Sequence, residues 1–122
     1  GSGSAVATQA IISQTAGASY NVWATIYEGA GVIEIAKITA RITNAGTNAR
    51  VGLRITIDGT IVVETPTNKW TIPDNSTTIY VLGPGSVDFP SSVYSSQTMK
   101  VEMFNMDSAP QVSATVVGQE FG

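Results

Sequence analysis

The stretch Val51–Val63, VGLRITIDGTIVV, decides the fold class. In its first half, four apolar residues alternate with four others: Val51, Leu53, Ile55 and Ile57 against Gly52, Arg54, Thr56 and Asp58. Apolar residues at every second position indicate a strand with one buried face. Asp58-Gly59 then separates this strand from a second apolar run, and both central residues of a type I′ turn need positive φ. The stretch therefore predicts a hairpin with a two-residue turn, with Leu53 buried and Arg54 exposed.

The preceding stretch, Val32–Thr43, also has a period of two, most strictly from Ala36 onward. Its predicted inner face carries Val32, Glu34, Ala36, Ile38, Ala40 and Ile42, and its outer face carries Ile33, Ile35, Lys37, Thr39, Arg41 and Thr43. This pattern predicts one long, half-buried strand before the hairpin.

Shorter alternating segments surround these two. They are Tyr20–Glu28, Thr77–Leu82, Val87–Phe89, Met99–Phe104 and Val112–Val117, while residues 65–76 and the Ser-rich residues 86–96 are predicted to be mainly irregular. Val, Ile and Thr are plentiful, and these β-branched residues suit strands better than helices. About eight strands with turns between them predict an all-β fold, a single antiparallel β-sandwich of jelly-roll type.

The chain is organised as one domain with a short preceding segment. Residues 1–4, GSGS, have the character of an expression scar, and residues 5–19 are predicted to form an arm or a first edge strand. The sandwich is assigned to residues 20–122. Because residues 5–19 contain no charge and no clear period, we expect them to contact a neighbouring subunit.

Several absences restrict the chemistry. The sequence has no Cys and no His, which removes disulfides, thiolate nucleophiles and the commonest general base and metal ligand. Six basic residues and a net charge of −3 do not suit nucleic-acid binding. No apolar run approaches the ~18 residues of a membrane span. The sequence predicts no enzyme, no cofactor, no metal site and no membrane insertion.

Two residue patterns are weak candidates for catalysis: a pair of glutamates and a serine with a lysine base. Glu28 and Glu34 flank Gly29–Gly31 and would face each other in a hairpin, an arrangement that can perform acid–base chemistry on sugars. Two solvated side chains beside a turn explain the same pattern. A serine nucleophile would need a lysine base, and no Ser-x-x-Lys spacing is present. No catalytic residue is assigned.

The aromatic residues give the best candidate binding site. Trp70 falls in a polar segment beside Asn68, with Asp74 and Asn75 nearby, and Tyr94 in the Ser-rich segment is a second candidate. An exposed indole stacks on a sugar face while amide and acid groups bind hydroxyls. The alternative is that Trp70 closes one end of the sandwich or packs at a subunit contact.

Two segments resemble small β-sandwich domains of bacteriophage virion proteins. The first is Tyr20–Glu64, with Gly29-x-Gly31-Val32-Ile33 and the run LRITIDGT at Leu53–Thr60; the second combines a Pro/Ser segment at Phe89–Ser96 with MKVEMFN at Met99–Asn105. The resemblance implies a non-enzymatic virion protein of tail-fibre, receptor-binding or capsid-decoration type. It also implies a homotrimer that binds other virion proteins and a host surface glycan. The alternative function is a carbohydrate-binding module of a larger extracellular protein.

Overall fold

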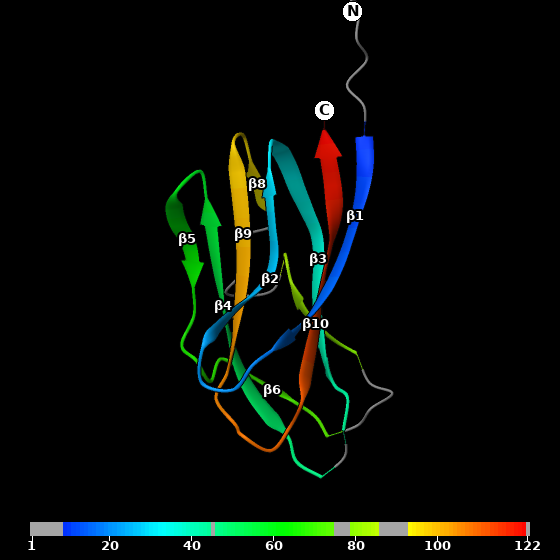
Figure 1. Ribbon diagram of the computed structural model, residues 1–122, viewed down its shortest axis with the longest axis vertical. Coiled ribbons are helices and arrows are strands. Elements are labelled where there is room, and N and C mark those ends of the chain that lie inside the picture. The colour runs from blue at the N-terminus through cyan, green and yellow to red at the C-terminus, as the bar shows by residue number, and fades with distance from the viewer. Residues whose placement is uncertain (1–8, 45, 75–78, 86–92, 122) are drawn as a thin grey trace, which may run out of the picture.

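The chain folds into two antiparallel sheets packed face to face, as the computed structural model shows (Figure 1). The structure describes residues 9–44, 46–74, 79–85 and 93–121. These residues form ten strands and no helix, so the predicted all-β sandwich is confirmed. Accordingly, they contain no helix with the length and apolar character needed to cross a membrane.

The strand order is that of a jelly roll. Sheet A has the order β1–β10–β3–β7 with β8 also paired to β3, and sheet B has the order β2–β9–β4–β5 with β6 also paired to β4. The bounds are β1 Gln9–Ala18, β2 Trp23–Ala30, β3 Val32–Ile42, β4 Ala49–Ile57, β5 Thr60–Glu64, β6 Trp70–Ile72, β7 Tyr80–Gly83, β8 Val93–Ser95, β9 Thr98–Asn105 and β10 Val112–Phe121. Strands β1 to β4 alternate between the sheets, and β9 and β10 do so again. This connectivity places segments from both ends of the chain side by side.

Ten strands appear where about eight were expected because two positions in the sheets are each filled by two short strands. β5 and β6 both pair with β4, while β7 and β8 both pair with β3. Pro66 lies between β5 and β6, and Pro84 directly follows β7. Proline has no N–H to donate to a ladder, so each proline interrupts the pairing.

Four sequence expectations concern these short strands. Residues 65–76 were predicted to be irregular, but they contain the strand β6. Residues 86–96 were also predicted to be irregular, but they contain the strand β8. The strand predicted at Thr77–Leu82 is found as β7, Tyr80–Gly83, although residues 75–78 are outside the described residues. The strand predicted at Val87–Phe89 lies outside the described residues altogether.

The hairpin predicted from Val51–Val63 is confirmed. Ile57 pairs with Thr60, so the turn has two residues, and Asp58 and Gly59 have φ values of 51° and 83°. Leu53 is fully buried, whereas the Arg54 side chain lies on the outer face and is 24% exposed. The period of two in β4 therefore sets which residues reach the core.

The faces predicted for β3 are wrong in its first half. Ile33 and Ile35 are buried there and Glu34 is exposed, although the second half keeps the predicted inner residues, such as Ile38. The cause is a bulge, because the β10 register passes from Val117 opposite Lys37 to Gly118 opposite Ile35, and Ala36 has no partner. One extra residue reverses the faces on either side of it.

The core lies between the sheets and is almost entirely aliphatic. Its fully buried large side chains are Ile26, Ile33, Ile38, Ile42, Leu53, Ile55, Ile72, Leu82, Met99, Met103, Val51 and Val101. They come from both sheets, so each strand contributes one face and presents the other to the surroundings. The two outer faces are therefore the broad surfaces on which a binding site can be built.

Candidate binding site on the outer face of sheet A

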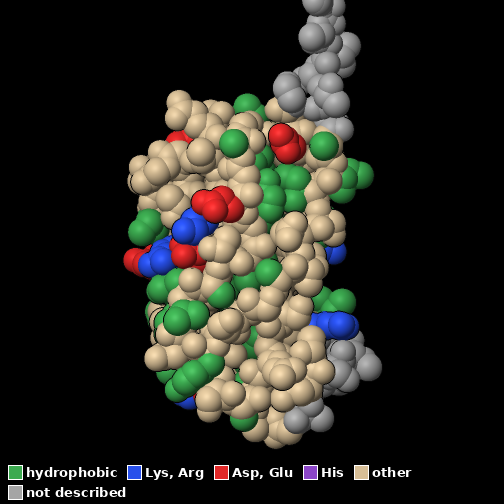
Figure 2. Space-filling view, in the orientation of Figure 1, with side chains coloured by type: hydrophobic (Ala, Val, Ile, Leu, Met, Phe, Trp, Pro, Cys, Tyr) green, Lys and Arg blue, Asp and Glu red, His purple; other side chains and the backbone are tan. Residues whose placement is uncertain are grey.

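The outer face of sheet B is occupied by contacts within the domain. Arg54 forms two hydrogen bonds to Glu102, with Nε–Oε1 and Nη2–Oε2 distances of 3.0 and 3.1 Å, and these bonds raise the pKa of the guanidinium. The guanidinium also lies 4.5 Å from the centroid of the Trp23 ring. Figure 2 shows charged side chains of both signs gathered on the side of the molecule where Figure 1 places sheet B. Because these charges satisfy one another, this face offers few free groups to a ligand.

A second arginine is also paired. Arg50 donates to both carboxylate oxygens of Asp107, at 2.7 and 3.1 Å, and its backbone N–H donates to the same carboxylate at 2.8 Å. These bonds lower the pKa of Asp107. They fix the start of β4 to the connection between β9 and β10.

The outer face of sheet A differs from that of sheet B in both its apolar and its charged residues. Five exposed large hydrophobic residues belong to it: Ile11, Val32, Ile79, Val81 and Tyr94. Arg41 is also exposed on this face, and no carboxylate of the described residues forms an ion pair with it. Arg41 is thus the one arginine of the three in the sequence with no such partner in the described part of the chain.

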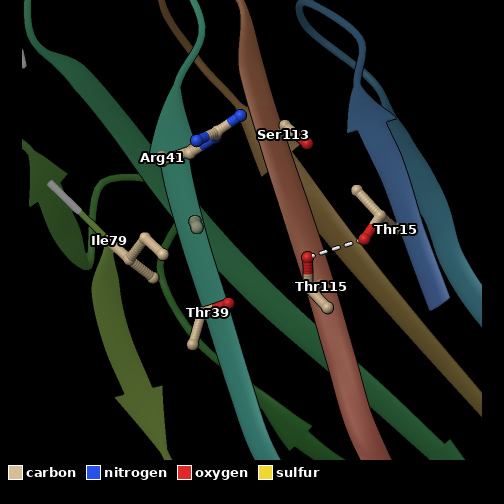
Figure 3. Close-up of a pocket in the computed structure, with 7 residues that line it drawn as sticks. Thr15, Thr39, Arg41, Ile79, Ser113 and Thr115 are labelled. Atoms are coloured by element: carbon tan, nitrogen blue, oxygen red, sulfur yellow. Dashed lines mark hydrogen bonds between the residues drawn. The ribbon is translucent and has the colours of Figure 1, made fainter. Parts of the chain in front are cut away.

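Arg41 lies at a hollow of about 190 Å³ on this face. Six further residues line the hollow: Thr15, Thr39, Ala40, Ile79, Ser113 and Thr115. Figure 3 shows Arg41 reaching from β3 toward Ser113 on β10, with Ile79 on the other side of β3. The described part of the lining therefore combines one guanidinium, four hydroxyl groups and the exposed apolar side chain of Ile79.

The strand register explains how residues from three parts of the chain meet there. Thr15 of β1 is opposite Thr115 of β10, which is opposite Thr39 of β3. The hydroxyls of Thr15 and Thr115 are hydrogen-bonded, with 2.8 Å between their oxygens. In the next row on the same face, Gly17, Ser113 and Arg41 are opposite one another. Small residues beside a long arginine leave open space on an otherwise flat sheet.

Of the site predicted around Trp70, the structure describes Asn68, Trp70 and Asp74. Trp70 is the first residue of β6, pairs with Val51, and packs partly buried against the core. This finding corrects its expected position in a loop. Asn68 is exposed in the preceding turn. Asp74 is exposed and accepts the Gly46 N–H through both carboxylate oxygens at 3.0 Å. Its carboxylate therefore binds the backbone of the segment between β3 and β4.

The remaining predicted contact residues lie elsewhere. Tyr94 is 63% exposed on β8. Figure 1 places β8 at the opposite end of the sandwich from β6, so Tyr94 and Trp70 do not form one site. Asn75 lies outside the described residues.

The expected pairing of Glu28 with Glu34 is wrong. β2 and β3 belong to different sheets, and the chain crosses between them at Gly31, whose φ is 104°. Glu28 is opposite Lys100, whereas Glu34 is opposite Gln119 and Tyr94. The two carboxylates therefore lie on different sheets and do not face each other across a hairpin. Among the described residues, no group of three or more acidic side chains is arranged to hold a metal ion.

Sequence reasoning identified the parts of the hollow but not their meeting. The alternation in β3 already assigned Thr39 and Arg41 to the outer face. Thr15 and Thr115 are 100 residues apart in the chain, and only the pairing of β1 with β10 brings them together. The spacing of acidic residues in the sequence gave no signal, because Arg50 pairs with Asp107, which is 57 residues away.

Comparison with known proteins gives a limited result. No protein-family model and no curated protein matches the sequence. Among solved structures, a chain in a structure of the infectious bursal disease virus Gx strain is similar over 91% of this chain, with 12% identity and a TM-score of 0.40. A chain in a structure of the Gt strain is similar over 93%, with 12% identity and a TM-score of 0.41. The present chain spans about a third of the length of each, 31% and 32%.

Proposed function

We propose that this chain is a non-enzymatic structural domain exposed on a bacteriophage particle, in a tail fibre or as a capsid decoration, and that it acts by binding. The proposal is supported by the sequence segments that resemble phage virion domains, Tyr20–Glu64 and Met99–Asn105, which hold β2 to β5 and β9 of the jelly roll. Its partners are other virion proteins, further copies of the chain, and a host surface glycan. The hollow on the outer face of sheet A is lined by groups that can bind a ligand, a guanidinium and several hydroxyls.

The observation that carries the proposal is the open edge of β1. β1 is the end strand of sheet A, is ten residues long, and contains neither a charged residue nor a proline. Its ten pairs with β10 run without a register shift. A long, regular, uncharged edge presents a row of unpaired N–H and C=O groups to any other strand. Such an edge is stable in solution when another chain covers it.

The end strands of sheet B lack these properties. β2 contains Glu28 and has a register shift against β9 between Thr25 and Tyr27. β5 has only five residues, ends at Glu64, and has a register shift against β4. Bulges, charges and short length are the devices by which proteins prevent pairing at an edge. The contrast supports the proposal that a partner covers the edge of β1.

We further propose that the partner is a second copy of the chain and that the closed assembly is a homotrimer. A ring of three requires a head-to-tail contact, in which β1 of one copy meets a different surface of the next. Ile11 on β1 is 83% exposed, as expected for a side chain that becomes covered on assembly. Pairing at the edge of β1 covers Ile11 and leaves the parts of the outer face on β10 and β3 accessible.

The test is the mass of the protein in solution, measured by light scattering across a range of concentrations. The parent chain is expected at three times the 12.7 kDa of one chain. Ile11→Lys places a charge at the proposed contact without touching the core, and it should shift the mass toward that of a monomer. Ile61→Lys is the matched control, because Ile61 is 50% exposed on β5 of the other sheet.

Two results would contradict the proposal: a parent chain that is monomeric at every concentration, or two variants that dissociate equally. Deleting residues 5–19 is a poor test, because Ile12 and Ala18 of β1 belong to the core. The deletion would damage the fold together with the contact.

The alternative function, a carbohydrate-binding module of a larger extracellular protein, is supported by one observation, the hydroxyl-lined hollow beside Arg41. A monomer with glycan affinity would favour this alternative over the virion domain. The glycan contact first proposed at Trp70, Asn68, Asp74, Asn75 and Tyr94 remains a separate prediction.

A further inference from the structure

We infer that the hollow beside Arg41 binds the ring of an acidic sugar, with the sugar carboxylate on the guanidinium. The inference rests on the part of the proposed function that assigns glycan contact to this domain. It assigns that contact to the outer face of sheet A and specifies a negatively charged ligand.

Arg41 differs from the other two arginines in its pairing. Arg50 and Arg54 each donate two hydrogen bonds to one carboxylate, which is the geometry that arginine prefers. Arg41 is exposed, lines the hollow, and has no carboxylate partner among the described residues. A ligand carboxylate would complete at Arg41 the arrangement that the other two arginines already have.

Hydroxyl groups form much of the lining of the hollow. Thr15, Thr39, Ser113 and Thr115 all contribute to the hollow. In the hydrogen-bonded pair of Thr15 and Thr115, one hydroxyl hydrogen is used, so the pair retains a donor and several acceptor lone pairs. Groups that both donate and accept suit sugar hydroxyls, which also do both. Neighbouring strands are ~4.8 Å apart, so the Thr15, Thr115 and Thr39 row offers hydroxyls at regular intervals across a ring.

The size of the hollow and its one exposed apolar side chain in the described lining also suit a sugar ring. A space of about 190 Å³ is smaller than the ~300–1,000 Å³ of pockets that hold drug-sized ligands, and it suits a single ring. Ile79 is 58% exposed at the side of the hollow and can cover the C–H face of a ring. An apolar wall with a few placed polar groups is the usual composition of a small-ligand site.

A phosphate is a poorer match than a carboxylate. Phosphate sites combine several cations or a set of free backbone N–H groups, as at a helix N-terminus. β10 is paired on both sides, with β1 and β3, and the hollow has one cationic side chain in the described part of its lining. One guanidinium matches the single negative charge of a sugar acid.

The test is a titration of isotope-labelled protein, followed by amide chemical shifts, with three probes: glucuronate, glucose and acetate. Glucose lacks the carboxylate and acetate lacks the ring. Glucuronate should bind in roughly the millimolar range and about tenfold more tightly than either other probe. The shifts should centre on Thr39, Arg41, Ser113 and Thr115.

Variants locate the site. Arg41→Gln should weaken glucuronate binding about tenfold, the effect expected from losing a charge-assisted hydrogen-bond pair. Thr115→Val keeps the side-chain shape, removes the hydroxyl, and should weaken binding several-fold. Lys37→Gln is the control, because Lys37 is a cation on the same strand and the same face but outside the lining.

Four outcomes would overturn the inference. They are no shift with glucuronate, acetate binding as tightly as glucuronate, equal effects of Lys37→Gln and Arg41→Gln, or glucose binding that Trp70→Ala abolishes and Arg41→Gln leaves intact. The last outcome would refute the hollow as the site while preserving glycan contact. The mass measurements on Ile11→Lys test the assembly independently of all four.

Discussion

Asp58 and Ser96 connect two turns that lie 38 residues apart in the chain. The Asp58 carboxylate accepts the Ser96 hydroxyl at 2.7 Å and also accepts the backbone N–H groups of Gln97 and Thr98 at 2.7 and 2.9 Å. The β4–β5 turn of sheet B is thereby attached to the connection between β8 of sheet A and β9 of sheet B. Hydrogen bonds to an ionised carboxylate favour its charged form, and they lower the pKa of Asp58 from 3.8 to about 2.

This depressed pKa predicts a defined acid dependence. A carboxylate with a lower pKa in the folded state stabilises the fold fully above its unfolded pKa of 3.8, and loses that contribution as the pH falls toward about 2. Asp58→Asn removes the charge but suits the φ of 51°, because Asn also adopts positive φ in an Asn-Gly turn. Thermal melts should show the variant less stable than the parent at pH 7, with the difference shrinking below pH 3.8. Equal melting temperatures at pH 7 would contradict this role.

The Arg54–Glu102 pair should contribute more stability than the Arg50–Asp107 pair. The Glu102 side chain is only 7% exposed, and Arg54 contacts both Glu102 and the Trp23 ring, whereas the Arg50 side chain is 50% exposed. Glu102→Gln should cost about 1–3 kcal/mol in urea unfolding, because it leaves a partly buried guanidinium with a weaker acceptor. Arg50→Gln, the matched control, should cost less than about 1 kcal/mol. The reverse order would show that burial does not govern these pairs.

Gly118 allows the close approach of β10 to β3 at the bulge. A Cβ at this position would collide with the backbone carbonyl of Glu34, and backbone cannot move aside as a side-chain end can. Gly118→Ala should therefore destabilise the domain by about 1–3 kcal/mol. Gly17→Ala is the control, because its Cβ would meet only the Val112 carbonyl oxygen at 3.8 Å. If the two variants unfold at the same urea concentration, the sheet relaxes around the new methyl group and this explanation is wrong.

Trp70→Ala should lower stability as well as any binding. Trp70 packs partly buried against the core, so the cost is expected at about 2–3 kcal/mol, below the ~3–5 kcal/mol of a fully buried aromatic residue. The hypothesis of a solvent-facing Trp70 requires little change in stability. A melting temperature equal to that of the parent, with weaker glycan binding per folded molecule, would restore that hypothesis.

Local rules predicted the parts of the fold that depend on neighbouring residues. Asp58-Gly59 specified its turn because both residues tolerate positive φ, and the alternation around Leu53 set the buried face of β4. The faces of β3 were predicted wrongly before Ala36, because a bulge depends on which residues of β10 lie opposite. Glu28 and Glu34 were expected to be opposite for a similar reason, since a short Gly turn can join two strands of one hairpin or carry the chain between sheets.

The candidate site was harder to predict because it depends on pairing between the ends of the chain. The aromatic residues of the sequence directed the prediction to Trp70, which the pairing of β6 with β4 holds partly buried against the core. Arg41 and Thr115 become neighbours only when β10 inserts between β1 and β3. No local pattern in the sequence encodes that insertion.

The most direct test of the central claim is amide hydrogen exchange along β1, measured at a concentration where the assembly is complete. In an isolated domain, alternate N–H groups of an end strand point toward its one neighbour and the others point to solvent. If a second chain covers the edge of β1, the amides from Ile11 to Gly17 should all exchange slowly, and those that point away from β10 should become fast in Ile11→Lys. Protection of only every second amide in the parent protein, at the highest concentration, would show that the edge is open and would contradict the proposed assembly.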